Sequence, residues 1–349
     1  MSDPIRVALD AMGGDHAPAE IVAGAVQAAR AYNIGVYLVG REETIRAELA
    51  KHDTAGLDLP LVHAEEVIEM DEHPATAVRR KKRSSMTLAL QLVRDGAAVG
   101  AVSAGNSGAM MAASLFTLKS IAGIERPALG SIFPTEKQPS LVLDVGANTD
   151  CKPEYLLQFA LMGSIYMERV FHVPSPRVAL LSNGEEESKG NKQVVEAHQL
   201  LRMHAKTLGI NFIGNVEGRD IPAGVVDVIV CDGFVGNVVL KLSEGLAETL
   251  IGLVRAQMSS TLLSKLAGAI LRPGLRATFR RLDYAEYGGV PLLGLNGVSI
   301  IAHGRSNAKA IKNALRVARE TAETGVPAAI REGVVRLNSQ EGKREAQIQ

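Results

Sequence analysis

The residues best suited to chemistry lie in six short polar loops, each directly after an apolar run typical of a buried strand. In chain order these loops are DAMGGDHAP, SAGNSG, DVGAN, NGEEESKGN, GNVEGRD and CDGFVGN. Glycine lets a ligand approach the backbone closely, while Asn, Asp, His and Lys add directional hydrogen-bonding groups and positive charge. This combination suits a small anion together with a polarised carbonyl group.

The position of the loops after strands predicts that they form one site. Strands of a parallel sheet end at the same edge, so the loops that follow them meet in one crevice. None of the six contains a G-x-G-x-x-G fingerprint or a G-x-x-x-x-G-K-[ST] phosphate loop. A nucleotide is therefore not the expected ligand.

The first loop combines a carboxylate, a glycine turn and a histidine. Asp10 ends a predicted strand, Gly13 and Gly14 make the turn, and Asp15 and His16 come just before a helix. A helix N-terminus attracts anions, and histidine donates to phosphate or moves a proton near neutral pH. We expect this loop to bind substrate, with His16 as a catalytic candidate. The alternative is that Asp15 caps the helix and His16 satisfies a loop carbonyl.

The second and third loops offer hydroxyl, amide and carboxylate groups. Asn106 and Ser107 stand where a helix begins, and both residue types are favoured as helix N-caps whether or not they bind anything. Asp144 and Asn148 follow a strand expected to lie nearby. This pairing favours a substrate-binding role for all four residues.

The fourth loop contains a lysine beside a helix start. Lys189 can pair with phosphate as a point charge, which makes it a catalytic candidate. The alternative is that it only neutralises the preceding carboxylates Glu185, Glu186 and Glu187.

The last loop is the most informative. Asp232 ends an apolar strand, Gly236 and Asn237 open the next helix, and Lys241 follows one turn later. The Asn237 amide can stabilise a developing oxyanion, so Asn237 is a catalytic candidate. Asp232 and Gly236 are expected to bind substrate. Cys231 ends a strand rich in Val and Ile, where cysteine is usually an inert core residue.

Metal and cofactor signals are weak. The eight histidines show no H-x-x-x-H spacing and the cysteines do not form a close pair, so we expect no metal and no cofactor. A spatial cluster of Asp144, Asp227 and Asp232 around Mg²⁺ stays open at this point.

The elements that must hold these loops alternate along the whole chain, which predicts a mostly parallel sheet covered by helices on both faces. Expected strands are RVALD, VYLVG, LVHA, AVGAVSA, SLVLDV, RVALLS, INFIGNV, VDVIVC and VSIIAHG. Expected helices are 19–31, 42–51, 86–95, 107–119, 153–169, 191–207, 236–256 and 307–323. We expect a catalytic unit over 1–335, built as one lobe or as two interleaved lobes, and a polar tail over 336–349.

The composition fits a globular cytoplasmic protein. The formal net charge is zero and aromatic residues make up 4%, which argues against a nucleic-acid partner. The two cysteines, Cys151 and Cys231, are too few for a disulfide framework. The N-terminus enters an apolar strand at once, so we expect no export signal, and no apolar run reaches the roughly 18 residues of a membrane span.

Two basic segments are candidate partner surfaces. The first is the run Arg79, Arg80, Lys81, Lys82 and Arg83. The second lies in 255–282, which predicts two short amphipathic helices with a corner at Pro273; its basic residues include Lys265, Arg272, Arg276, Arg280 and Arg281. Such a hairpin suits an anionic membrane surface or an acidic protein, and packing in a homodimer explains it equally well.

Taken together, these loops resemble those of the PlsX family. The matching segments are DAMGGDHAP at 10–18, RRKK-x-SSM at 79–86, SAGN-[ST]-G at 103–108, DVGAN at 144–148, E-x-x-KGN at 186–191, DGF-x-GNV-x-LK at 232–241, YGG at 287–289 and HG-x-S at 303–306. The resemblance runs from about residue 5 to residue 330, and the combination is specific where a single loop is not.

The resemblance implies a three-layer α/β/α fold similar to isopropylmalate dehydrogenase and phosphotransacetylase, and a homodimer at the inner face of the cell membrane. It implies an acyltransferase that moves a long-chain fatty acyl group reversibly from acyl carrier protein to inorganic phosphate, for phospholipid synthesis. A membrane glycerol-3-phosphate acyltransferase would use the acyl phosphate. The alternatives are a coenzyme A phosphotransacetylase, a metal- and NAD-dependent decarboxylating dehydrogenase, and a non-catalytic membrane adaptor for acyl carrier protein.

Overall fold

The computed structural model describes residues 5–261, 263–271, 274 and 284–348. Its centre is a sheet of 11 strands. In spatial order the strands are β3 (Leu61–His63), β2 (Gly35–Gly40), β1 (Arg6–Asp10), β4 (Gly100–Ser103), β11 (Val298–Ile301), β10 (Val290–Leu293), β5 (Ala128–Phe133), β6 (Ser140–Leu143), β9 (Val228–Val230), β7 (Arg177–Leu181) and β8 (Asn211–Val216).

The sheet consists of two parallel groups that run in opposite directions. Strands β3, β2, β1, β4 and β11 are parallel to one another, and so are β6, β9, β7 and β8. Between the groups, β11–β10, β10–β5 and β5–β6 pair antiparallel. A sheet that is mostly parallel is confirmed, but the expectation that all six polar loops follow strands of one direction is wrong.

The helices match most of the predicted ranges. They are α1 (Ala19–Tyr32), α2 (Glu42–Leu49), α3 (Pro74–Arg80), α4 (Ser85–Arg94), α5 (Ser107–Thr117), α6 (Pro153–Val170), α7 (Lys192–Leu208), α8 (Asp220–Ala223), α9 (Gly233–Ser259), α11 (Tyr284–Tyr287), α12 (Ala308–Glu323) and α13 (Val326–Ile348). The sequence did not predict α3, α8, α11 or α13, nor the two antiparallel strands β5 and β10.

Side-chain caps explain where the long helices begin after the strands. Asn106, Asn191 and Asn307 each accept a hydrogen bond from the backbone N–H three residues later, and Asp232 does the same at α9. Such a bond satisfies one of the N–H groups that a helix start leaves without an intrahelical partner. Much of the Asn and Asp content of the polar loops therefore stabilises helix starts.

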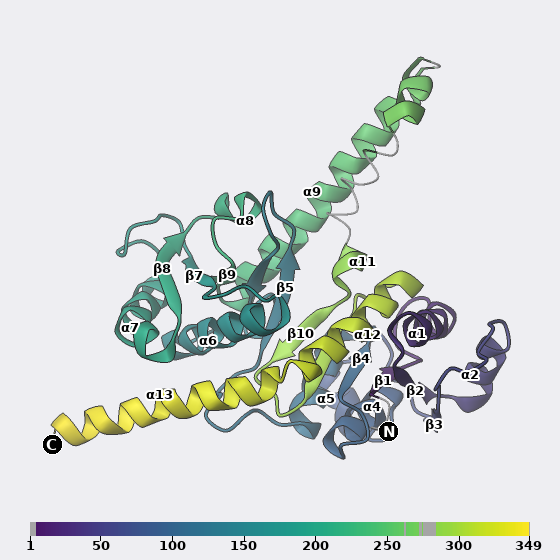
Figure 1. Cartoon of the computed structure of the whole chain (residues 1–349), viewed down its shortest axis with the longest axis horizontal. Coiled ribbons are helices and arrows are strands. Elements are labelled where there is room, and N and C mark those ends of the chain that lie inside the picture. The colour runs from purple at the N-terminus through teal and green to yellow at the C-terminus, as the bar shows by residue number, and fades with distance from the viewer. Residues whose placement is uncertain (1–4, 262, 272–273, 275–283, 349) are drawn as a thin grey trace.

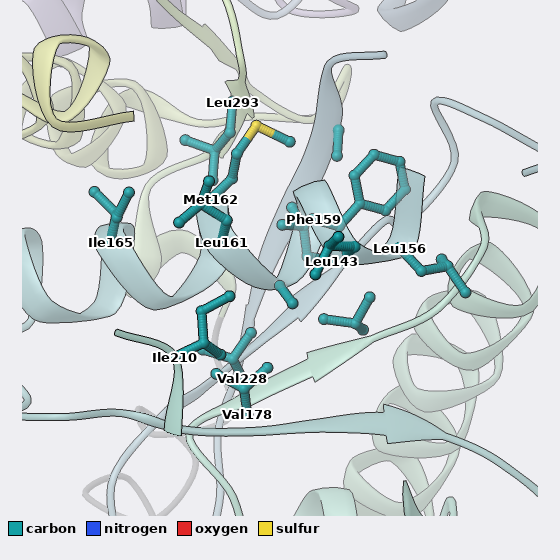
Figure 2. Close-up of a cluster of buried hydrophobic side chains, with 14 of the residues drawn as sticks. Leu143, Leu156, Phe159, Leu161, Met162, Ile165, Val178, Ile210, Val228 and Leu293 are labelled. Atoms are coloured by element: carbon teal, nitrogen blue, oxygen red, sulfur yellow. The ribbon is translucent and has the colours of Figure 1, made fainter. Parts of the chain in front are cut away.

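The strands alternate their side chains between two apolar layers. On β1, Val7 and Leu9 pack into a cluster with α1 and α12, whereas Ala8 packs into a cluster with α4 and α5. On β6, Leu141 and Leu143 face the cluster of α6, drawn in Figure 2, and Val142 faces the cluster of α4 and α5. Helices thus cover both faces of the sheet, which confirms the predicted three-layer α/β/α arrangement.

Helix α6 packs against strands β6, β7 and β9 of the second group and supplies much of the apolar cluster there. Its residues from Tyr155 to Met167 are all buried, so it packs on several sides rather than along one stripe. Phe159 and Met162 belong to one buried apolar cluster with Leu143 and Val228, which Figure 2 shows.

Helix α9 projects away from the body of the molecule (Figure 1). It is one helix of 27 residues. The corner expected at Pro273, and with it Arg272, Arg276, Arg280 and Arg281, lies outside the described residues. At the C-terminus, α13 continues through the segment expected as a polar tail as far as Ile348, and Leu337 is buried against α6 and its neighbours. The predicted extent of the catalytic unit stays a prediction.

Candidate active site

The loops after β1, β4 and β11 pack against one another. The backbone N–H of Asp15 donates to the carbonyl of Gly304 at 2.8 Å. A Cβ placed on Gly13 would lie 2.7 Å from the backbone nitrogen of Gly105, and Gly14 has a φ of 110°. Only glycine tolerates both the close approach and that backbone conformation, so the Gly13–Gly14 pair is needed to bring these loops together.

Asp10 is a buried carboxylate that holds this loop group. The Ser103 hydroxyl donates to its Oδ2 at 2.7 Å, and the Met12 backbone N–H donates to its Oδ1 at 3.1 Å. Burial raises the pKa of Asp10, and the hydrogen bonds oppose that rise. Its side chain is engaged within the protein, and Asp10 does not line the cavity described below.

Asp144 is a buried carboxylate that holds the loop after β6, in the second group of strands. Its carboxylate accepts five N–H hydrogen bonds, from the backbones of Leu129, Gly146, Ala147 and Asn148 and from the Asn148 side chain. Burial raises the pKa of Asp144 and these donors counteract the rise. The Asn148 amide also donates to the carbonyl of Pro127 at 2.8 Å. Both side chains are thus engaged in shaping the loop.

The start of α9 crosses directly over this loop. Asp232 caps the helix, and the Gly233 N–H donates to the carbonyl of Asn148 at 2.6 Å. A Cβ on Gly236 would lie 1.9 Å from the backbone oxygen of Asp144. Gly236 therefore lets the helix pass close enough to place Asn237 beside Gly146.

A cavity of about 640 Å³ lies between α5 and the start of α9, over strand β5. Its polar wall includes Ser107, Asn237, Lys241, Glu244, His303 and Ser306. Its apolar wall includes Met111, Ile132, Phe133, Ile221, Leu240 and Val290. The two loop groups therefore meet at this cavity although their strands run in opposite directions, because its walls take residues from both groups.

The cavity brings together only part of the predicted site. Asn237 and Ser107 line it, whereas Lys189, His16, Asp15, Asn106 and Asp232 do not. Asn106 caps α5, and its amide donates to the carbonyls of Met70 and Glu72. Lys189 and His16 are exposed on loops after β7 and β1.

A buried polar chain holds the loop that carries Lys189. His198 Nδ1 and Asn215 Oδ1 lie 2.9 Å apart, and the Asn215 amide donates to the carbonyl of Glu186 at 2.9 Å. The Lys189 backbone N–H donates to the same carbonyl at 3.0 Å. The position of Lys189 therefore depends on α7 and β8 as well as on its own loop.

Three titratable residues that line the cavity, Lys241, Glu244 and His303, were assigned no role from the sequence. Lys241 and Glu244 form an ion pair at 2.8 Å on the face of α9 that carries Asn237. His303 is half-buried, its Nδ1 accepts the Arg305 N–H at 3.1 Å, and burial lowers its pKa while Glu244 opposes this. The spacing of 237, 241 and 244 along one helix and the HG-x-S motif were the signals that pointed to these residues.

The cysteines are unsuited to nucleophilic chemistry. Burial raises the pKa of Cys231 well above its usual value and that of Cys151 to about 12. Since the thiolate is the reactive form, both thiols are held in the unreactive state. Among the described residues, no group of three or more His, Cys, Asp or Glu side chains is arranged to hold a metal ion.

The basic run divides into exposed and engaged residues. Lys81 donates to the carbonyl of Val67 and pairs with Glu72, whereas Arg79, Arg80, Lys82 and Arg83 are exposed. Lys265 is also exposed, beyond α9. No described helix is both long enough and apolar enough to cross a membrane.

Comparison with known proteins gives one consistent family. The model of the family described as "Fatty acid synthesis protein" matches residues 5–329. A "Phosphate acyltransferase" of Pelotomaculum thermopropionicum is 55% identical over 330 residues, which cover 95% of each chain. One of Geobacter sulfurreducens is 55% identical over 322 residues, which cover 92% of each chain. The fold is similar to that of a phosphotransacetylase from Streptococcus pyogenes, with a TM-score of 0.63, 17% identity, and coverage of 93% of this chain and 95% of that one.

The family model and the relatives agree over nearly the whole chain, and the matched range contains every loop that forms the cavity. The chain therefore belongs to the PlsX family of fatty acid synthesis proteins and is an acyltransferase.

Proposed function

We propose that the protein transfers a long-chain fatty acyl group reversibly from the thioester of acyl carrier protein to inorganic phosphate, forming an acyl phosphate. The observation that carries this proposal is the cavity at the junction of the two strand groups. Its apolar wall suits an acyl chain, and its polar wall offers donors for a thioester carbonyl and a phosphate. The relatives named phosphate acyltransferase support phosphate as the acceptor.

The proposed reaction balances without a cofactor. Inorganic phosphate is partly dianionic near neutral pH, so an oxygen of the hydrogenphosphate dianion attacks the thioester carbonyl carbon directly. The Asn237 amide donates to the oxyanion that forms, the carbon–sulfur bond breaks, and the proton of hydrogenphosphate passes to the departing thiolate. No covalent acyl-enzyme is required, which agrees with the state of the two cysteines.

Lys189 and His16 remain phosphate ligands in this proposal, but they act from outside the cavity wall. Both are exposed. The loop of His16 is hydrogen-bonded to the His303 turn through Asp15 and Gly304, and the loop of Lys189 follows β7, the neighbour of β9 from which α9 begins. We assign them the capture of phosphate as it approaches.

The test is an assay of the purified protein. Acyl carrier protein thioester and phosphate should yield a product that hydroxylamine traps, and coenzyme A thioester should be a much poorer donor. A preference for coenzyme A would favour a phosphotransacetylase. Binding of acyl carrier protein without product would favour an adaptor, and a requirement for nicotinamide cofactor and metal would favour a dehydrogenase.

The basic run is the proposed landing surface for acyl carrier protein, an acidic protein. Helix α3, which carries Arg79 and Arg80, starts next to the cavity wall, since a Cβ on Gly108 would lie 2.8 Å from Pro74. Replacing Arg79 and Arg80 by Glu should raise the KM for the carrier thioester at least about tenfold, because opposite charges steer association. Lys206→Glu, a charge reversal at another exposed position, on α7, is the control. An unchanged KM in the double variant would reject this surface.

The exposed apolar side chains of α9 are the proposed surface for a second copy of the chain. Those of the segment after α9 are the proposed surface for lipid. Leu242, Leu250 and Leu253 are about 60% exposed on α9, and Leu263 and Ile270 still more so beyond it. Burial of such a stripe against a second copy would form the homodimer, and a monomer mass by light scattering would reject it.

Membrane attachment is proposed for the segment beyond α9, since apolar and basic side chains together favour an anionic bilayer surface. The double variant Leu266→Glu and Ile270→Glu should no longer float with anionic vesicles while its turnover in solution is retained. Val335→Glu, which adds a charge at another exposed apolar position, on α13, is the control. Flotation of the double variant with the vesicles would exclude this attachment site. Peripheral attachment of this kind would deliver acyl phosphate to a membrane glycerol-3-phosphate acyltransferase.

A further inference from the structure

Ser306 is a polar residue in the cavity wall whose hydroxyl has no hydrogen-bond partner among the residues that the structure describes. The residue is 1% exposed. Leaving a buried hydroxyl unpaired costs free energy, and native proteins rarely do so without a reason. One rotatable bond is enough to turn this hydroxyl toward a ligand in the cavity.

His303 stands in the same turn and has a defined donor atom. Its carbonyl accepts the Ser306 N–H at 2.9 Å, which closes the turn. Because Nδ1 accepts the Arg305 N–H, the proton of the neutral ring is on Nε2. Burial lowers the pKa of His303, so the neutral form with its Nε2–H donor dominates near neutral pH.

The N-terminus of α5 faces the same cavity. Ser107 and Gly108 are the first residues of this 11-residue helix and both line the wall. The Asn106 side chain accepts a hydrogen bond from the N–H of Ala109. The N–H groups of Ser107 and Gly108 belong to the N-terminal end of the helix, which carries a partial positive charge. The unpaired Ser306 hydroxyl is an independent indication that a ligand belongs here.

We propose that His303, Ser306 and the N-terminus of α5 form the inner subsite that binds the phosphate oxygens during acyl transfer, opposite Asn237. This inference rests on the proposed function. Donors predominate in the subsite, which favours a phosphate with several oxygens over a single thioester carbonyl. The carboxylate of Glu244 is neutralised by Lys241, and Asp15 is outside the wall.

The first test measures the binding of inorganic phosphate in the absence of an acyl donor, and turnover is measured afterwards. Titration of the full-length protein with inorganic phosphate, followed by ³¹P NMR or calorimetry, should show affinity at least about tenfold weaker in Ser306→Ala, the loss expected for a hydrogen bond to a charged ligand. Ser299→Ala is the matched control, because the Ser299 hydroxyl is equally buried but pairs with Ser114 at 2.9 Å. It should bind phosphate like the unmodified protein.

Steady-state kinetics then distinguish an effect on phosphate binding from an effect on binding of the carrier thioester. Ser306→Ala and His303→Gln should raise the KM for phosphate about tenfold or more while the KM for the carrier thioester stays unchanged. An unchanged phosphate affinity and KM in both variants, or a rise confined to the thioester KM, would overturn the inference and leave the proposed function standing. If the unmodified protein forms no acyl phosphate, the proposed function fails, and the titration still decides whether the subsite binds phosphate.

Discussion

Replacement of Asn237 by alanine is expected to lower the turnover number at least about a hundredfold, because an oxyanion donor of this kind contributes about 3 kcal/mol to transition-state stabilisation. Asn237 lines the cavity at the start of α9, and its exposed side chain is not needed to hold the fold. The rate of hydroxylamine-trapped acyl phosphate formation under saturating substrates is the measurement. The thermal midpoint should stay within a few degrees of that of the unmodified protein.

Two comparisons make this result specific. Asn211→Ala removes the same amide from an exposed position on β8, where it donates to the carbonyl of Ser175, and should leave turnover unchanged. Lys189→Ala should raise the KM for phosphate more than it lowers turnover, because Lys189 lies outside the cavity wall. Full turnover in Asn237→Ala would remove the oxyanion role from the mechanism.

Replacement of Gly236 by alanine is the second change with a large expected effect. Alanine normally stabilises a helix by about 1 kcal/mol relative to glycine. Here the added Cβ would meet the Asp144 backbone oxygen at 1.9 Å and Cys231 Sγ at 3.0 Å, so α9 must move away from the loop that it crosses. We expect the free energy of unfolding to fall by about 3 kcal/mol and activity to be lost with it.

The control for this prediction lies on the same helix. A Cβ on Gly245 would meet no atom of the other described segments within 4 Å, so Gly245→Ala should show the ordinary gain of helix propensity. Urea unfolding of both variants at equal protein concentration is the measurement. A midpoint for Gly236→Ala equal to or above that of Gly245→Ala would mean that α9 does not pack on Asp144 in the way described.

Local patterns were sufficient for most of the strands and for the long helices other than α13. A helix cap acts over three residues, so Asn106 could be located as a cap from the chain alone, whereas the caps Asn191 and Asp232 were not predicted. Whether such a residue caps a helix or binds a ligand is not a local property. Asn106, Asp144 and Asn148 were expected to bind substrate, whereas their side chains are engaged with the backbone of the protein.

By itself the sequence determined the alternation of strands and helices, the three-layer class and the polar loops that border the site, since these depend on periodicity and short-range capping. Only the tertiary structure decided the reversal of direction in the middle of the sheet. Strands β5 and β10 carry Gly130 and Pro291, so their identity depends on distant neighbours rather than on their own pattern. That reversal sets α5 and the His303 turn opposite α9, and hence which polar residues share the cavity, because contacts between segments so far apart in the chain arise from packing alone.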